Sequence, residues 1–374
     1  MAKLTYIALF PILYIITTHL LHVLYFAGGF SNSKASLSGK TVVVTGANTG
    51  IGKHTALDMA ARGARVILAC RSGKKTLPVV EEIKKKTKNS QVLFMELDLA
   101  SFDKVQRFVD EFLESENRLD ILINNAGMVT TGEDTPQLTE DGIEMTLMVN
   151  HLGHMFLTEQ LLDLIKKSGP GSRIVTVSSM GHNYANPSAF KDLDNLKVDG
   201  AANYVVLDRP TTLPRSSDIL WPLFKPLLSK PPFIRYSNSK LANVLFSKEL
   251  GKRLAGSGVT TYSLHPGAIM TDLGVDRNTG KDMFGMDRNS GVMQMINDLP
   301  EFIMPVSFAF KSVVEGAQTT ICCSVNEELA NESGLYYSDC VAEKVYREEL
   351  NDEFTAKFWE WSENLIREAL KKAN

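Results

Sequence analysis

A glycine-rich turn directly after a β-branched run is the feature that most restricts the fold of this 374-residue chain. Residues 42–44 are three valines that read as a buried strand, and the sequence TGANTGIG at residues 45–52 follows them and opens a helical stretch. Glycines permit a tight turn and let backbone N–H groups approach a pyrophosphate, whose charge a helix N-terminus stabilises. The turn therefore predicts a nucleotide site at the start of a βαβ array.

Short apolar runs alternate with stretches of helical periodicity after residue 39. Most of these runs are too apolar for a one-sided sheet, so they suit strands buried between two helical layers. The alternation predicts an α/β fold: a Rossmann-type doubly wound parallel sheet of about seven strands, with helices on both faces. The runs are residues 41–45, 65–69, 92–97, 121–123, 174–177, 259–264 and 335–337.

The N-terminus reads as a membrane anchor. Residues 4–26 contain no Asp, Glu, Lys or Arg. As a helix they would span about 34 Å, and the hydrocarbon core of a bilayer is about 30 Å thick. A cleaved signal peptide is the alternative, although its apolar region is typically only about 7–15 residues long. We therefore expect residues 1–38 to form one transmembrane helix and a short polar linker.

Composition excludes several other classes of protein. Forty basic and 43 acidic residues give a formal net charge of −3, so no global field favours a nucleic-acid partner. The cysteines show neither a C-x-x-C spacing nor a zinc-ligand pattern, so no metal site is predicted. A disulfide framework is not expected at this cysteine density, and the four are interpreted as free or buried thiols in a reducing compartment. They are Cys70, Cys322, Cys323 and Cys340.

The spacing T-G-x-x-x-G-x-G resembles that of the short-chain dehydrogenase/reductase family, and later motifs follow in that family's order. Residues 124–127 are similar to its N-N-A-G element, although Asn124 could instead only brace adjacent strands. The resemblance implies that residues 39–374 form one such domain, in which Asp98 contacts the adenine and Thr271 the carboxamide. The implied cofactor-binding residues are Gly46, Asn48, Thr49, Gly50, Ile51, Gly52, Lys53, Arg71, Asp98, Asn124, Ala126, Gly127, Tyr236, Lys240, Pro266, Gly267 and Thr271.

The end of the second apolar run bears on the choice between NAD and NADP. An acidic residue there would bond the ribose 2′-hydroxyl of NAD and repel a 2′-phosphate. The run ends Ala69-Cys70-Arg71 instead, and Arg71 can make a bidentate contact with a phosphate. Lys53 could add a second positive charge, while both cations could also be plain solvated residues. NADP(H) is therefore the predicted cofactor.

A Y-x-x-x-K element carries the predicted chemistry. Of the ten tyrosines, only Tyr236 has a lysine four residues on, and positions i and i+4 share one helix face. A nearby cation lowers the pKa of a tyrosine, which tunes the phenol as a general acid or base. We expect Lys240 to act on Tyr236 in this way.

The family resemblance adds two residues and completes a catalytic tetrad. It implies that Ser179 holds the substrate carbonyl oxygen and that Asn150 relays protons through water, beside Tyr236 and Lys240. Ser178 is the alternative to Ser179, because adjacent strand residues point to opposite faces. Three nearby histidines are interpreted as local hydrogen-bonding groups rather than metal ligands: His151, His154 and His182.

Several stretches resemble the microsomal retinol dehydrogenase (retinal reductase) branch of the family: residues 49–53, 68–71, 149–154, 239–243, 315–319 and 337–340. The resemblance implies an NADP(H)-dependent oxidoreductase that interconverts a lipophilic carbonyl, a retinal-like aldehyde foremost, and its alcohol. It further implies a single-pass protein of the endoplasmic reticulum membrane with its catalytic domain facing the cytosol. A steroid or other lipid ketone as substrate, or a non-catalytic membrane-bound NADP sensor, are the alternatives, and a homo-oligomer is compatible with the pattern.

One segment departs from the family pattern. Ser179 and Tyr236 are 57 positions apart, whereas most relatives have a much shorter gap. The extra residues belong to a Pro-rich apolar insertion at about 186–233, which we expect to shape the mouth of the substrate cleft. It could dip into lipid through Trp221 and Phe224, or pack as a surface loop. A sequon at Asn331 leaves the membrane topology open.

Overall fold

The computed structural model describes residue 17 and residues 27–130, 135–186, 193–199, 229–269, 311–345 and 351–373. Eight of the described segments form one sheet in the order β3-β2-β1-β4-β5-β6-β7-β8. They are β1 (Thr41–Thr45), β2 (Arg65–Cys70), β3 (Val92–Glu96), β4 (Ile121–Asn124), β5 (Ser172–Val177), β6 (Val259–His265), β7 (Leu335–Ser338) and β8 (Val341–Glu343). The order reverses between β1 and β4, the position at which doubly wound sheets bind ligands.

Strands β1 to β7 pair in parallel, as the apolar runs predicted. Val43 on β1 is opposite Ile67 on β2 and Leu122 on β4. Every residue of β1, β4 and β5 is buried, because helices cover both faces of the sheet. The predicted count of seven strands was one short, since β8 pairs antiparallel with β7 at the edge of the sheet.

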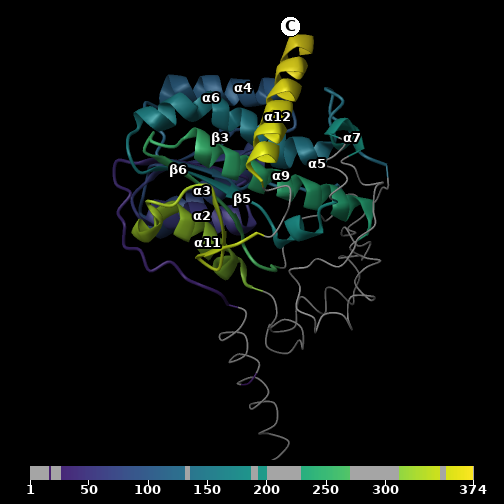
Figure 1. The fold of residues 1–374 in the computed structure, drawn as a ribbon. Coiled ribbons are helices and arrows are strands. Elements are labelled where there is room, and N and C mark those ends of the chain that lie inside the picture. The colour runs from purple at the N-terminus through teal and green to yellow at the C-terminus, as the bar shows by residue number, and fades with distance from the viewer. Residues whose placement is uncertain are drawn as a thin grey trace, which may run out of the picture.

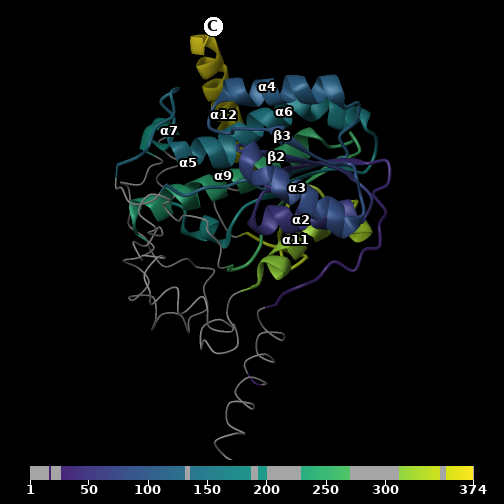
Figure 2. The ribbon, with the colours of Figure 1, turned by 180° about the vertical axis from the view of Figure 1, so that it is seen from behind.

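Helices form a layer on each face of the sheet (Figures 1 and 2). One layer contains α2 (Gly50–Ala61), α3 (Gly73–Thr87) and α11 (Val313–Val325), and the other contains α4 (Phe102–Ser115), α6 (Gly153–Lys167) and α9 (Pro231–Arg253). Each layer has its own apolar core against the sheet. The shorter elements are α5 (Met145–Leu147), the π-helical turn η1 (Met148–Leu152), the 3-10 turns η2 (Met180–Tyr184) and η6 (Glu327–Leu329), and α7 (Leu193–Asp199).

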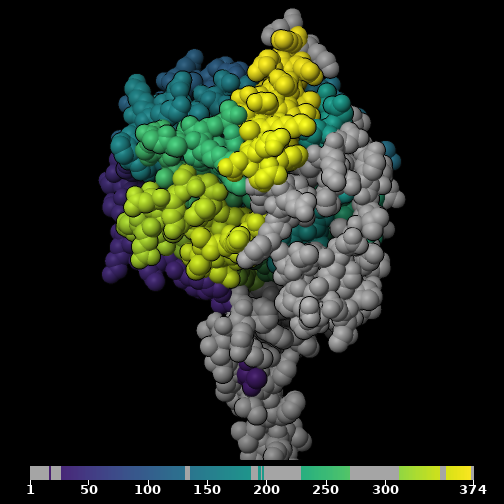
Figure 3. All heavy atoms as spheres, viewed as in Figure 1, coloured from purple at the N-terminus to yellow at the C-terminus, as the bar shows by residue number. Residues whose placement is uncertain are grey.

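The C-terminal helix α12 (Asp352–Ala373) lies across the outer side of α9, and Figure 3 shows it on the surface of that face. Its apolar side packs on the layer below, where Trp359 stacks on Phe246 with ring centroids 5.5 Å apart. The guanidinium of Arg253 lies 4.6 Å from the Trp359 ring, a cation–π contact that also fixes the helix.

The segment predicted as a polar linker is bound to the domain from its first described residues. Gly28 lies against Asp339 and Lys311, and Ser31 Oγ donates a hydrogen bond to Asn326 Oδ1 at 2.6 Å. Arg62 Nη1 donates to Ser33 O at 2.9 Å. Within the residues described, no helix is long and apolar enough to cross a bilayer. The predicted membrane segment lies outside them except for residue 17.

One further expectation needs correction. Cys322 and Cys340 form a disulfide, so only Cys70 and Cys323 are free and buried. The bond joins α11 to the turn between β7 and β8, which the fold brings together.

The insertion predicted at about 186–233 is described only in part. Helix α7 lies within it, and α9 begins at its end. Its remaining residues, Trp221 and Phe224 among them, lie outside the described part of the chain.

Candidate active site

The glycine-rich turn and the N-N-A-G element are in direct contact. Gly46 has a φ of +66°, and a Cβ built on it would lie 2.9 Å from the Cα of Ala126. Only glycine satisfies both the backbone angle and the close approach. Helix α2 starts just beyond, and its N-cap Thr49 makes no side-chain capping bond, so the first N–H groups are not used by that residue. This cradle fits a pyrophosphate at a helix N-terminus.

A threonine that the sequence argument did not single out holds these two turns together. Thr45 Oγ1 accepts hydrogen bonds from the N–H groups of Asn125 and Ala126, each at 2.9 Å. Asn125 Nδ2 donates back to Thr45 O at 2.7 Å. The signal for this pairing is weak in the sequence, because the partners are 80 positions apart and meet only when β1 and β4 are neighbours.

Two other members of the N-N-A-G element differ in what they contact. Asn124 Nδ2 donates to Thr158 Oγ1 at 2.9 Å, so this side chain braces β4 against α6. The alternative considered for Asn124 was a brace between adjacent strands, whereas its partner here is on a helix. Gly127 instead faces two members of the predicted tetrad, because a Cβ built on it would lie 3.3 Å from Lys240 Nζ and 3.6 Å from Asn150 Oδ1.

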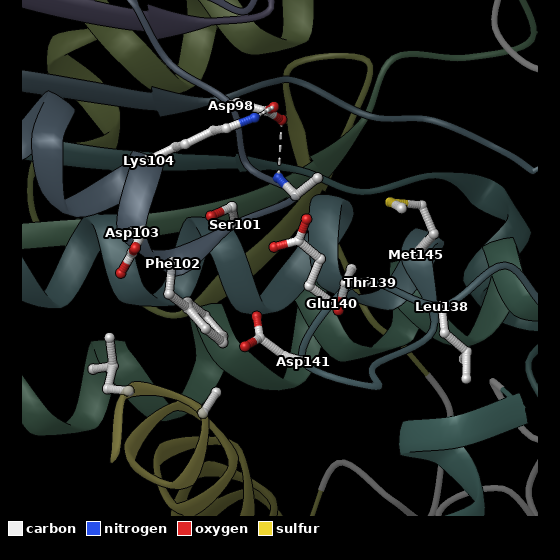
Figure 4. A pocket seen from close by; sticks show the side chains of 13 residues that line it. Asp98, Ser101, Phe102, Asp103, Lys104, Leu138, Thr139, Glu140, Asp141 and Met145 are labelled. Atoms are coloured by element: carbon white, nitrogen blue, oxygen red, sulfur yellow. Dashed lines mark hydrogen bonds and ion pairs between the residues drawn. The ribbon is translucent and has the colours of Figure 1, made fainter. Parts of the chain in front are cut away.

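Asp98 lies at the edge of a cavity of about 310 Å3 between the start of α4 and residues 138–145. Figure 4 shows its carboxylate turned toward Lys104, whose Nζ is 2.8 Å from Asp98 Oδ2. The rest of the lining includes the carboxylates of Asp103, Glu140 and Asp141. So acidic a lining disfavours a phosphate group, which has to bind elsewhere.

The two cations predicted to read a 2′-phosphate have different surroundings. Lys53 Nζ forms an ion pair with Glu82 Oε2 at 2.7 Å, and Lys86 Nζ binds the other oxygen of that carboxylate at 2.8 Å. The ammonium of Lys53 is therefore held at Glu82, although the three groups together keep a net positive charge. Arg71 is exposed after β2, and its charge acts on Asp98. Burial raises the pKa of Asp98, but the hydrogen bonds from Lys104 and a backbone N–H outweigh it and leave the pKa below its ordinary value. Arg71 is thus the better placed of the two cations.

Ser179 and Tyr236 form the centre of the site. The Ser179 hydroxyl faces the phenol of Tyr236 beside Gly181, and Ser179 Oγ accepts from the N–H of Gly181 at 3.0 Å. A lowered pKa was expected for Tyr236 from the nearby lysine, and this expectation was wrong. Burial raises the pKa of the phenol, and the nearby Ser179 hydroxyl offsets this only in part. Tyr236 is therefore a neutral phenol near pH 7, which is a proton donor.

Lys240 lies beside the phenol, on the same face of α9. Its Nζ is 5.6 Å from the centroid of the Tyr236 ring and donates to Val177 O at 3.0 Å. Burial lowers the pKa of Lys240 to about 8, because the charged form is desolvated. The distance to the ring explains why burial, rather than this cation, dominates the pKa of Tyr236.

Asn150 lies in the π-helical turn η1 and is fully buried. Its Oδ1 accepts from Met128 N at 2.8 Å, and its Nδ2 donates to Met128 O at 3.0 Å and to Ser239 Oγ at 2.9 Å. The amide thus ties the segment after the N-N-A-G element to the helix that carries Lys240.

The choice between the two serines follows from their partners. Ser178 Oγ donates to Lys240 O at 2.7 Å and is 2% exposed, so this hydroxyl fastens the end of β5 to α9. Ser179 faces Tyr236 instead.

After β6, Gly267 has a φ of +89° and donates its N–H to His265 Nδ1 at 3.0 Å. Thr271 lies outside the described residues.

Comparisons with known proteins give the family of the chain. Residues 40–190 match the family model described as short chain dehydrogenase. Mouse retinol dehydrogenase 11 is 38% identical over 95% of this chain and 94% of its own length, and human retinol dehydrogenase 13 is 40% identical over 91% and 89%. A crystal structure of an uncharacterized protein from Mycobacterium paratuberculosis has a TM-score of 0.60 at 28% identity, covering 91% of this chain and 98% of that one.

A Pseudomonas aeruginosa RhlG/NADP complex shares the fold, with a TM-score of 0.54 at 19% identity over 80% of this chain and 94% of that chain. Identity of 37–41% over most of the chain to retinol dehydrogenases, together with the family model, establishes the relationship. The family uses a nicotinamide cofactor. The chain therefore belongs to the short-chain dehydrogenase/reductase family and is an oxidoreductase that acts on CH–OH groups.

Proposed function

We propose that the protein is an NADP(H)-dependent reductase of lipophilic carbonyl compounds, with a retinal-like aldehyde as the favoured substrate. One observation carries the proposal: the side chains of Ser179 and Tyr236 lie together beside buried Lys240 at the carboxyl edge of the sheet, next to a cradle that fits a pyrophosphate. In a doubly wound sheet this edge is where substrates and cofactors meet.

The side chains divide the reaction between them. The Ser179 hydroxyl donates to the carbonyl oxygen and stabilises the negative charge that develops on it. Tyr236, kept neutral by burial, gives its phenolic proton to that oxygen. NADPH, when bound, supplies a hydride to the carbonyl carbon. The Lys240 ammonium stabilises the phenolate that remains and holds the nicotinamide ribose, and Asn150 supports the return of a proton through water.

The preference for NADP(H) rests on Arg71. β2 ends without an acidic residue, and the exposed guanidinium that follows can bind a 2′-phosphate in a bidentate contact. Lys53 contributes less, because its ammonium is already bound to Glu82. A reduced NADP pool favours the direction of reduction, which also suits the neutral state of Tyr236.

The substrate class is inferred from relatives and from the chain itself. The curated relatives named above are called retinol dehydrogenases, which supports a retinoid-like substrate here. A steroid or other lipid ketone is the second candidate within the same chemistry. A non-catalytic NADP sensor is disfavoured, because Asn150, Ser179, Tyr236 and Lys240 are all in place.

We further propose that residues 4–26 anchor the protein in a membrane, the endoplasmic reticulum in particular, as a single span. Gly28 packs on Asp339 and Lys311 beside the carboxyl ends of β6 and β7. A span that ended just before the first residue of this described segment would bring the edge of the sheet close to the membrane. The mouth of the cleft then faces lipid, where a lipophilic substrate is concentrated.

Two features bear on the orientation of the domain across the membrane, and they point to opposite sides. An NADP(H) preference favours the cytosol-facing side, whereas the Cys322–Cys340 disulfide favours an oxidising compartment. We place the domain in the cytosol. A glycosidase-sensitive mass at Asn331, which is exposed, would instead place it in the lumen.

The experiment is NADPH consumption by the full chain in membranes, with all-trans-retinal, a steroid ketone and a medium-chain aldehyde as substrates. Tyr236→Phe removes the proton donor and keeps the ring, and we expect it to abolish turnover. The matched control is Tyr262→Phe, which removes a hydroxyl bonded to Thr260 and Leu329 O away from the site. Equal turnover by wild type and Tyr236→Phe would refute the proposal.

A further inference from the structure

A buried histidine lies between the cofactor turns and the turn that carries Asn150. His154 is 1% exposed and follows η1, in which the Gly153 N–H bonds to Met148 O, five residues back. A π-helical turn of this kind shifts main-chain hydrogen bonds by one residue and is frequent at functional sites. Here His154 Nδ1 lies 3.1 Å from Asn150 O.

The partners of the ring determine its tautomer. A carbonyl oxygen can only accept, so Nδ1 carries the hydrogen and donates it to Asn150 O. Nε2 is then an acceptor, and Thr45 Oγ1 is 2.9 Å from it. The other acceptor within reach of this hydroxyl, Ile123 O, is farther away at 3.4 Å. Thr45 therefore donates to His154, while it accepts from Asn125 N and Ala126 N.

The charge state of the ring is fixed as well. Burial lowers the pKa of His154 to about 4, and the nearby charge of Lys240 acts in the same direction. The imidazole is neutral across the physiological range, so it keeps one donor and one acceptor. Both are used, and no second arrangement of hydrogens satisfies all the groups.

We propose that His154 is a positioning residue that couples the cofactor turns to Asn150 through this Thr45–His154–Asn150 chain. One end holds the hydroxyl that closes the two cofactor turns, and the other holds the main chain of Asn150. The Asn150 amide in turn binds Ser239, the neighbour of Lys240. The inference rests on the proposed function, because it assigns His154 a role in that same site.

Three substitutions distinguish the two hydrogen bonds of His154, one to Thr45 and one to Asn150 O. His154→Asn places a donor near Asn150 O and loses the acceptor for Thr45. His154→Gln places an acceptor near Thr45 and loses the donor to Asn150 O. His154→Leu removes both. The matched control is His151→Asn, which alters an equally buried ring that contacts Ser362 and Phe358 on α12 instead.

The readouts are the Kd of NADPH by fluorescence, kcat and KM for the aldehyde, and Tm. We expect His154→Gln to keep the Kd within 2-fold of wild type and to lower kcat, by up to about 100-fold for a displacement near 1 Å. We expect His154→Asn to raise the Kd with a smaller effect on kcat, and His154→Leu to do both. KM for the aldehyde should change little in all three.

The inference is overturned if, in the three variants, kcat and NADPH affinity fall only in proportion to Tm. A general loss of stability would give that pattern, and the His151→Asn control would then show it too. It is also overturned if His154→Leu matches His151→Asn in both parameters. If wild type binds NADPH but reduces no substrate, the proposed function fails. The Kd of NADPH for the His154 variants then still tests whether His154 is coupled to the cofactor turns, since that measurement requires no turnover.

Discussion

Ser178 and Ser179 are adjacent residues with opposite expected responses to the same substitution. Ser178→Ala removes a buried donor to Lys240 O, a bond of 2.7 Å. A neutral hydrogen bond of this kind contributes about 1 kcal/mol to the free energy of unfolding. For a domain of this size that corresponds to a Tm lowered by about 2 °C. Turnover per folded molecule should be nearly unchanged, because the hydroxyl faces α9 and not the reacting carbonyl.

Ser179→Ala removes the donor that faces Tyr236 and the substrate oxygen. Loss of one donor to a developing oxyanion typically lowers kcat by about 100- to 1,000-fold. Because Gly181 N is the other described partner of this hydroxyl, stability should fall only slightly. Thermal unfolding and NADPH-coupled kinetics on the two purified variants measure both effects. If Ser178→Ala were the variant that lost turnover, or if Ser179→Ala kept more than a tenth of it, the assignment would be refuted.

Three further predictions concern the cofactor, pH and the disulfide. Arg71→Glu should lower kcat/KM for NADPH by at least about tenfold and improve the use of NADH. Lys53→Ala should have a smaller effect, because its ammonium is already bound to Glu82. Kinetics with both cofactors check this. Lys240 has its pKa lowered to about 8, so the ammonium is lost as pH rises through that value, and the reductase activity should fall above pH 8. A pH–rate profile that stayed flat to pH 10 would contradict this. Cys340→Ser opens the bond to Cys322 across 18 positions and should cost about 3 kcal/mol, measured by denaturant unfolding; thiol titration of unreduced, unfolded wild type should find two thiols, not four.

Much of the fold was predictable because its signals are local. The apolar run at residues 41–45 matches β1 residue for residue, and the glycine turn stands between that strand and α2. β8 was missed because it has three residues, all exposed, and follows an unusual turn. Asp339 and Cys340 both have positive φ values there, 51° and 66°, in positions that commonly hold asparagine and glycine.

In the candidate site, too, contacts between residues close in sequence were predictable, and contacts between residues far apart in sequence were not. Tyr236 and Lys240 are one helical turn apart, so their shared face was predictable, whereas the raised pKa of Tyr236 comes from burial by elements far away in the chain. The contact of Thr45 with His154 spans 109 positions, and it depends on the π-helical turn, which no local pattern indicated. The disulfide likewise depends on the return of β7 and β8 to α11.

Transfer of deuterium from cofactor to substrate tests the central claim most directly. Full-length protein in membranes is given all-trans-retinal and NADPH that carries one deuterium at C4 of the nicotinamide. The two stereoisomers of this labelled NADPH are tried in turn, and the product is analysed by mass spectrometry. We predict retinol that carries one deuterium on its former carbonyl carbon with one isomer, and none with either isomer for Tyr236→Phe. Unlabelled alcohol from wild type with both isomers, or no alcohol despite measured binding of NADPH, would contradict the account.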